Sequence, residues 1–150
     1  MTPGIEGVTI RPLRRIDDAR GAVLHMLRAD DPWFAGFGEI YFSAVHAGAV
    51  KAWRRHRRLT SNVAVPAGSV RLVLVDGRAG SPDAGRRLEV VLGEDAYALV
   101  TIPPGVWAGW EGLGPGTALV ANCATGPHDP AEVERADAAS LAQAPGEGPR

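Results

Sequence analysis

Residues 51–68 read K-A-W-R-R-H-R-R-L-T-S-N-V-A-V-P-A-G, and residues 69–76 continue the chain as S-V-R-L-V-L-V-D. The first eight positions hold five of the sixteen Lys and Arg residues, one of the four histidines and one of the four tryptophans. The segment then turns apolar and ends in a Pro-Ala-Gly turn, and the apolar, β-branched run after it is typical of a strand buried on both faces. We therefore predict a strand on each side of this turn, and we expect the basic part to meet the ligand.

The rest of the chain repeats this pattern of short strands between turns. Further strands are predicted at residues 8–13, 22–27, 38–45, 87–92, 97–102 and 117–123. Gly, Pro and Asp separate them, at a spacing of roughly 10 residues that is typical of an all-β antiparallel sandwich or barrel. Only residues 130–142 read as a helix, and residues 143–150 read as a disordered tail.

Length and composition exclude several classes of protein. The 150 residues suffice for one ordinary domain, which we place at residues 1–130, with a C-terminal helix and tail at 131–150. The net charge of −1 argues against a nucleic-acid-binding protein, which usually has a basic excess. The single cysteine, Cys123, excludes an internal disulfide. With no signal segment and no apolar run near the roughly 20 residues of a membrane span, we expect a cytoplasmic protein that makes no membrane contact.

Four motifs follow one another along the chain. They are D-A-R-G at 18–21, G-A-V-K-A-W at 48–53, D-G-R-A-G-S-P at 76–82 and I-P-P-G-V-W-A-G-W at 102–110. Together they resemble the motifs of the dTDP-4-dehydrorhamnose 3,5-epimerase family and its sugar ketoisomerase relatives, in the cupin superfamily. The resemblance implies a cupin-type double-sheet jelly roll, followed by the short C-terminal helix or tail predicted above from the residue pattern. It also implies a homodimer that binds a nucleoside-diphosphate sugar inside the barrel.

The chain departs from this family at the catalytic positions. The family's base histidine falls on Arg54, and the histidine of its proline–glycine motif falls on Ala108. Its general-acid tyrosine belongs on the strand at 117–123, where the nearest residues are Ala121 and Asn122. Arginine does not act as a base near neutral pH, because its pKa exceeds about 12. Two functions therefore stay open. One is an epimerase or isomerase that abstracts a proton alpha to the ketone of a dTDP- or other NDP-4-keto-6-deoxysugar; the other is a non-catalytic nucleotide-sugar-binding or partner protein.

Arg54 and His56 are the first candidates for chemistry. They lie two positions apart on a predicted strand and so share a face, which the resemblance turns into the barrel. There Arg54 or Lys51 would stabilise an enolate, and an inward Arg54 would also match a diphosphate or a sugar carboxylate. His56 would move the proton, and His128, in the turn after the last strand, is the alternative carrier.

Three basic residues are predicted to bind substrate on the strength of the resemblance. Lys51 lies where the family has a substrate-contacting basic residue. Arg20 and Arg78 lie in the arginine-bearing loops, the first of which contacts the substrate's phosphates in the family. Pairing of Arg78 with Asp76 of its own loop is an equally good interpretation.

Polar and aromatic residues complete the predicted binding site. Asn62 has the inward parity and is a candidate hydrogen-bond partner of the ligand, with a turn or core role as the alternative. Trp107 and Trp110 are candidates to stack on a base or sugar, although tryptophans on strands more often pack in a core or a dimer interface. Arg55 and Arg57 have the outward parity and are interpreted as a solvated basic edge.

A metal site is not expected. A metal-binding cupin needs roughly three histidines and one carboxylate on one face. The corresponding positions hold Arg54, His56, Ser61 and Ala108, and a permanent cation beside a single imidazole opposes metal binding. We therefore expect no metal and no other cofactor, which disfavours a metal-dependent cupin oxygenase or isomerase.

Overall fold

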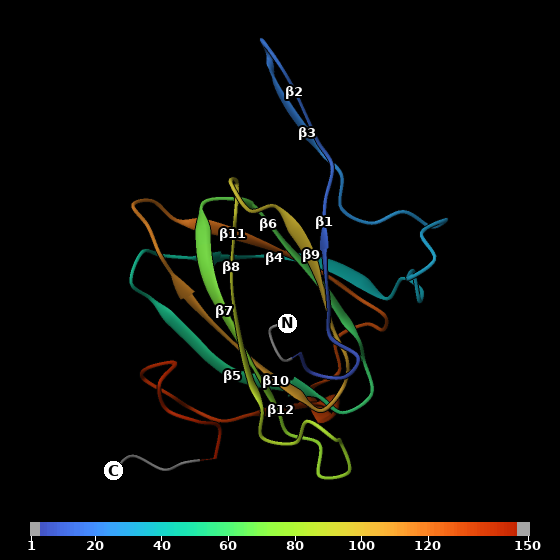
Figure 1. Ribbon diagram of the computed structural model, residues 1–150, viewed down its shortest axis with the longest axis vertical. Coiled ribbons are helices and arrows are strands. Elements are labelled where there is room, and N and C mark those ends of the chain that lie inside the picture. Colours follow the sequence, from blue (N-terminus) through green and yellow to red (C-terminus); the bar gives the residue numbers. More distant parts are fainter. Residues whose placement is uncertain (1–3, 147–150) are drawn as a thin grey trace.

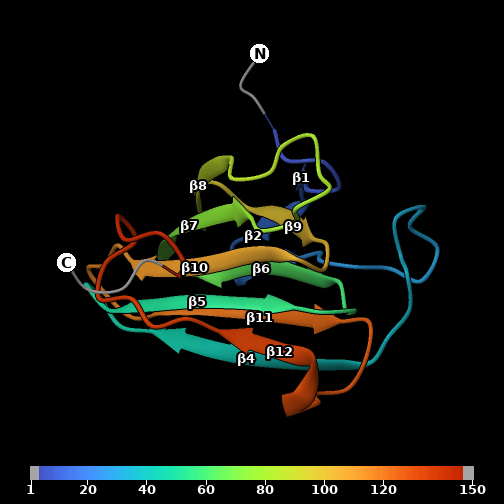
Figure 2. The ribbon, with the colours of Figure 1, turned by 90° about the horizontal axis from the view of Figure 1, so that it is seen from below.

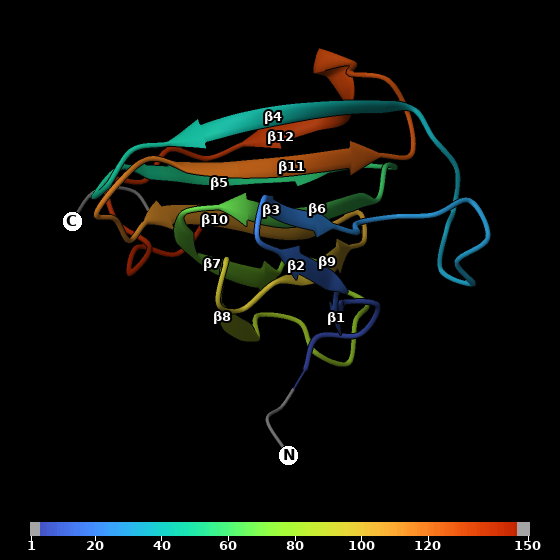
Figure 3. The same cartoon turned by 90° about the horizontal axis from the view of Figure 1, so that it is seen from above.

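The structure, a computed structural model, describes residues 4–146 and contains two five-stranded sheets that face each other (Figures 1–3). The first sheet has the order β1 (Thr9–Pro12), β9 (Ala98–Ile102), β6 (Ser61–Ala67), β11 (Ala118–Ala124) and β4 (Glu39–Val45). The second has the order β12 (Val133–Arg135), β5 (Val50–His56), β10 (Val106–Gly112), β7 (Ser69–Asp76) and β8 (Arg87–Gly93). The hairpin of β2 (Arg15–Asp18) and β3 (Gly21–Leu24) projects away from both (Figure 1). The predicted all-β double-sheet jelly roll is confirmed, and within residues 4–146 no helix is long and apolar enough to cross a membrane.

Apolar side chains fill both faces of β7. Val70, Leu72 and Leu74 are fully buried between the two sheets, where they pack against residues of both. On the opposite face of β7, Val73 is fully buried in a second, smaller cluster with Trp53 and Leu141. The prediction from the apolar, β-branched run, a strand buried on both faces, is confirmed.

The basic stretch forms two strands rather than one. β5 ends at His56, residues 57–60 form the connection, and β6 begins at Ser61 in the opposite sheet. Face parity counted from β5 therefore does not carry over to β6. The neighbour of β5 in its sheet, β10, was not predicted by the sequence pattern and contains Gly109 beneath Trp53. A Cβ at Gly109 would lie 2.7 Å from Cδ2 of Leu141. The same glycine that weakens the strand signal is thus required by close packing.

The C-terminal segment folds differently from the prediction. A single 3-10 turn, η1 (Pro130–Glu132), is the only helix in residues 130–142, so the predicted helix is wrong beyond this turn. The chain then pairs with β5 as β12 and runs along the outer face of the second sheet (Figures 1 and 2). Backbone pairing with β5 replaces the hydrogen bonds that a helix would make internally, so tertiary context overrides the local pattern.

The start of the predicted disordered tail is packed. Nε1 of Trp53 donates to the carbonyl of Gln143 at 2.8 Å, and Nη1 of Arg87 donates to the carbonyl of Leu141 at 2.6 Å. Leu141 is 1 % exposed and Trp53 is 2 % exposed. Residues 147–150 of that predicted tail lie outside the described residues. Residues 136–143 thus cover the outer apolar cluster of the second sheet.

Substitution Leu141→Ala tests this covering role. We expect it to lower the free energy of unfolding by about 2–5 kcal/mol, because it opens a cavity against Trp53. Leu113, which is 46 % exposed, supplies the matched control, and Leu113→Ala should change stability by no more than about 0.5 kcal/mol. Denaturant unfolding measures both values. Equal effects of the two variants would contradict the packed position of the segment.

Candidate functional site

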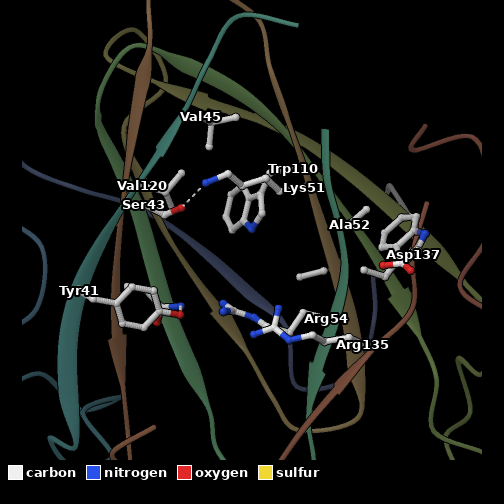
Figure 4. Close-up of a pocket in the computed structure, with 13 residues that line it drawn as sticks. Tyr41, Ser43, Val45, Lys51, Ala52, Arg54, Trp110, Val120, Arg135 and Asp137 are labelled. Atoms are coloured by element: carbon white, nitrogen blue, oxygen red, sulfur yellow. Dashed lines mark hydrogen bonds between the residues drawn. The ribbon is translucent and has the colours of Figure 1, made fainter. Parts of the chain in front are cut away.

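A cavity of about 350 Å³ opens between the two sheets, with β4 on one side and β5 on the other (Figure 4). Its polar walls come from strands of both sheets and from the C-terminal segment. They comprise Tyr41, Ser43, Lys51, Arg54, Trp110, Asn122, Arg135 and Asp137. Three of the residues predicted from the sequence, Lys51, Arg54 and Trp110, are thus brought together in one cavity.

An irregularity in β5 turns both Lys51 and Arg54 into this cavity. The two residues lie three positions apart, so regular alternation would place them on opposite faces. Arg54 is the partner of Ala108 and Lys51 is the partner of Trp110, so β5 has one residue more than β10 between these pairs. Such a bulge redirects the side chains that follow it.

Lys51 connects the two walls of the cavity. Its Nζ donates to Oγ of Ser43 at 2.9 Å and to the carbonyl of Ala44 at 2.7 Å, both on β4 of the opposite sheet. The ammonium group therefore lies in the cavity at a defined position, as the dashed line in Figure 4 marks for Ser43.

A tyrosine that the sequence analysis missed faces the same cavity. Tyr41 lies on β4, and its hydroxyl oxygen accepts a hydrogen bond of 2.9 Å from Nδ2 of Asn122 on β11. The guanidinium of Arg54 lies 5.9 Å from the centre of the Tyr41 ring. Tyr41 could have been found from alternation in the strand at 38–45, since Tyr41 and Ser43 share the face opposite two exposed apolar residues, Ile40 and Phe42. Asn122 thus supports a tyrosine from the neighbouring strand in place of the one expected on β11.

His56 faces the barrel interior as predicted and is held by a buried glutamate. Its Nδ1 lies 2.6 Å from Oε2 of Glu132, which is 2 % exposed. The other oxygen, Oε1, accepts the backbone N–H groups of Arg58 at 2.7 Å and Leu59 at 2.9 Å. Glu132 was missed because no local pattern links two residues that lie 76 positions apart.

Glu132 is an anion at neutral pH. Burial raises its pKa, but the N–H of Arg58, His56 and the N–H of Leu59 more than offset this, and the pKa falls to about 2. An ionised carboxylate accepts the Nδ1 proton of His56, so the neutral ring carries its lone pair on Nε2.

His56 shares a small space with two other residues that carry unpaired polar atoms. Within the described part of the chain, Nε2 of His56, Oγ of Ser61 and Oδ1 of Asn122 are buried and accept or donate no hydrogen bond. All three residues line a second space of about 20 Å³, which shares the walls formed by Arg54, Trp110 and Asn122 with the larger cavity. A volume of this size suits one water-sized polar group with several hydrogen-bond partners. The inner end of the cavity is thus built to receive a polar atom beside His56.

Two of the remaining predicted residues support the fold around the cavity without lining it. Arg78 pairs within its own loop, donating from Nε to Oδ1 of Asp76 at 2.9 Å, and it also donates from Nη2 to the carbonyl of Glu6 in the N-terminal segment at 2.6 Å. Although burial raises the pKa of Asp76, hydrogen bonds from Arg78 and Ser81 lower it to about 2. Trp107 lies on the outer face of the second sheet, where the centre of its ring is 4.5 Å from the guanidinium carbon of Arg55.

Three more predicted residues lie away from the cavity lining. The expected inward parity of Asn62 is wrong, because the chain changes sheets between His56 and Asn62; its Oδ1 accepts from Thr101 at 2.8 Å, and Ser61 faces inward instead. His128 is exposed in the loop after β11. Arg20 sits at the turn of the projecting hairpin, paired with Asp18 and 91 % exposed.

No metal ligand set is formed by the described residues. Between residues 4 and 146, no group of three or more His, Cys, Asp or Glu side chains is arranged to hold a metal ion. Cys123 is buried, and burial raises the pKa of its thiol, which disfavours a nucleophilic thiolate.

Substitution Glu132→Gln should destabilise the protein in a pH-dependent way. Folding lowers the Glu132 pKa from 4.5 to about 2, so its contribution is complete above pH 4.5 and is lost as the pH falls towards 2. We expect a loss of about 3 kcal/mol at pH 7 that shrinks over this window. Chemical denaturation at several pH values measures it, with the exposed Glu94→Gln as control. A penalty that does not change between pH 6 and pH 3 would contradict the lowered pKa.

Known proteins resemble this chain over most of its length. The dTDP-4-dehydrorhamnose 3,5-epimerase family matches residues 2–140. The probable low-salt glycan biosynthesis epimerase Agl13 of Haloferax volcanii is 30% identical over 129 residues, 85% of this chain and 83% of its own. The spore coat polysaccharide biosynthesis protein SpsL of Bacillus subtilis is 32% identical over 110 residues, 73% of each chain. The crystal structure of a dTDP sugar isomerase from Desulfovibrio desulfuricans G20 superposes with a TM-score of 0.87 at 51% identity, covering 89% of this chain and 85% of that one. The chain belongs to the dTDP-4-dehydrorhamnose 3,5-epimerase family.

Proposed function

We propose that this protein binds a nucleoside-diphosphate 4-keto-6-deoxysugar in the cavity and epimerises or isomerises it by moving a proton at the carbon beside the ketone. The observation that carries this proposal is His56, whose Nδ1 is held by a buried carboxylate while Nε2 faces the inner space without a partner among residues 4–146. The family supports the reaction class, since the similar proteins are named as epimerases and as a dTDP sugar isomerase.

The proton transfer follows from the state of the imidazole. Nε2 of His56 takes the proton from the carbon alpha to the ketone, directly or through one water in the inner space. The electron pair of the broken C–H bond forms a C=C bond, and the carbonyl oxygen becomes an enolate oxygen. A proton delivered to the opposite face of the same carbon by a second donor, the Tyr41 hydroxyl or a water, inverts it while His56 keeps the proton that it took. Proton shifts between neighbouring positions give an isomer. Glu132 stabilises the imidazolium that forms in between.

Tyr41 and a cation would stabilise the enolate. The Tyr41 oxygen already accepts a hydrogen bond from Asn122, so its own O–H is available to donate to the substrate oxygen. Lys51 or Arg54, both in the cavity wall, would supply the positive charge. Trp110 offers an aromatic surface for the sugar or the base.

Deuterium exchange tests the role of His56. Wild-type protein in D2O should incorporate deuterium beside the ketone of a TDP-4-keto-6-deoxysugar, and His56→Asn should lower the rate by about 10²- to 10⁴-fold. His128→Asn is the matched control, because His128 is exposed and lines neither space. Mass spectrometry of the recovered sugar gives the rates. An unchanged rate in His56→Asn, with loss in His128→Asn, would assign the proton to His128 instead.

A second candidate function is binding without catalysis. Arg54 at the position of the family's base histidine favours it, because a guanidinium does not accept a proton at neutral pH. A wild-type protein that binds the sugar nucleotide but exchanges no deuterium would establish this alternative. We also propose that the protein is cytoplasmic, as expected from the sequence.

The proposal also includes a homodimer that uses the projecting hairpin. Ile16 and Val23 are cross-strand partners in that hairpin and are 41 % and 58 % exposed. An isolated two-stranded hairpin is at best marginally stable in water, so a surface that covers these side chains would stabilise it. Contact with a second copy would also carry Arg20, at the hairpin turn, onto the partner molecule.

Substitution of the hairpin pair tests the dimer. We expect wild-type protein to sediment at twice the mass of the chain, and Ile16→Asp with Val23→Asp to sediment as a monomer, because two carboxylates would be buried in the interface. Val91→Asp, at an exposed valine on β8, is the control and should leave the mass unchanged. Analytical ultracentrifugation measures the masses. A wild-type monomer, or a double variant that remains dimeric, would contradict this interface.

A further inference from the structure

The pairing of β12 with β5 places charge differently on its two faces. On the outer face, Glu134 pairs with Arg55 at 2.5 Å and with Arg57 at 2.7 Å. On the inner face, Arg135 is the cross-strand partner of Arg54, and both line the cavity. The outer arginines therefore have a carboxylate partner, whereas the inner face presents two arginines side by side.

The two inner guanidinium groups have no acidic partner among residues 4–146. The side chains of Arg54 and Arg135 make no ion pair or hydrogen bond there; the guanidinium of Arg54 lies 5.9 Å from the centre of the Tyr41 ring. Figure 4 shows the two groups next to each other in the cavity. Like charges directly opposite each other on neighbouring strands destabilise a sheet, and an anion between them removes this cost.

The charge of the whole cavity indicates what kind of anion fits. Lys51 is a third cation in its wall, and Asp137 is the one carboxylate among the described residues that line it. Asp137 takes part in no ion pair, and in Figure 4 it lies on the far side of Ala52 from the Lys51 ammonium. Three cations against one carboxylate match a group with more than one negative charge, and two planar guanidinium forks match the oxygens of phosphoryl groups.

We propose that Arg54 and Arg135 together bind the diphosphate of the substrate. This inference rests on the proposed function for the kind of ligand, a nucleoside diphosphate, but not for the reaction. It gives the arginine at the family's base position a binding role, and it leaves Lys51 as the cation nearest to the enolate chemistry. It also makes β12 part of the binding site, although no sequence motif marks Arg135.

Isothermal titration with TDP and with inorganic pyrophosphate tests the clamp. Arg135→Gln should weaken binding of both ligands by about 10- to 100-fold, because a charge-assisted, bidentate contact is lost. The matched control is Arg57→Gln, at the residue that follows β5, because Arg55 still pairs with Glu134 in that variant. The control should bind both ligands as the wild type does.

Stability of the ligand-free protein separates binding from a structural role. Because Arg54 and Arg135 repel each other, ligand-free Arg135→Gln should melt at the same temperature as the wild type or higher, while the stabilisation by TDP shrinks. A residue that only holds β12 in place would instead lower the melting temperature without ligand. Thermal melts with and without TDP give both values.

The outcomes are distinct from those of the proposed function. Undiminished TDP affinity in Arg135→Gln, or binding of glucuronate but not pyrophosphate through Arg135, would overturn the diphosphate clamp. Arg135-dependent TDP binding supports it, whether or not the protein exchanges deuterium into a ketosugar. Deuterium exchange alone decides the reaction.

Discussion

The carboxylate of Glu132 joins three parts of the structure that the rest of the site depends on. It orients the His56 imidazole and accepts the backbone N–H groups of Arg58 and Leu59, where the chain leaves β5 for the opposite sheet. Glu132 is also the last residue of the 3-10 turn, and β12 begins directly after it. A buried carboxylate is stable only with such a full set of donors, so the turn, the imidazole and the C-terminal segment hold one another in place.

This arrangement explains how the chain differs from its family at the catalytic positions. The sequence resemblance puts the family's base at Arg54, but His56, two residues further along the same face, is the imidazole that faces the interior. The strand β11 has no tyrosine, but its Asn122 supports Tyr41 on the neighbouring β4. An imidazole and a tyrosine hydroxyl therefore both lie at the cavity, supplied from other positions of the same fold.

The C-terminal segment gives the second sheet two different faces. Outside, Leu141 covers Trp53, and Glu134 pairs with Arg55 of β5 and with Arg57. Inside, Arg135 adds a positive charge beside Arg54. The segment thus stabilises the fold through the outer face and sets the charge of the cavity through the inner one.

The sequence by itself determined the all-β fold, the family, and the face that Arg54 and His56 share, because strand alternation and turn residues are local properties. Lys51 faces the same cavity only because of the bulge in β5. Only the tertiary structure decided the rest. Parity failed for Asn62, because the chain crosses to the other sheet between β5 and β6. Glu132, Tyr41 and Arg135 join the site through the register of strands that are distant in sequence, and no local pattern encodes which strands become neighbours.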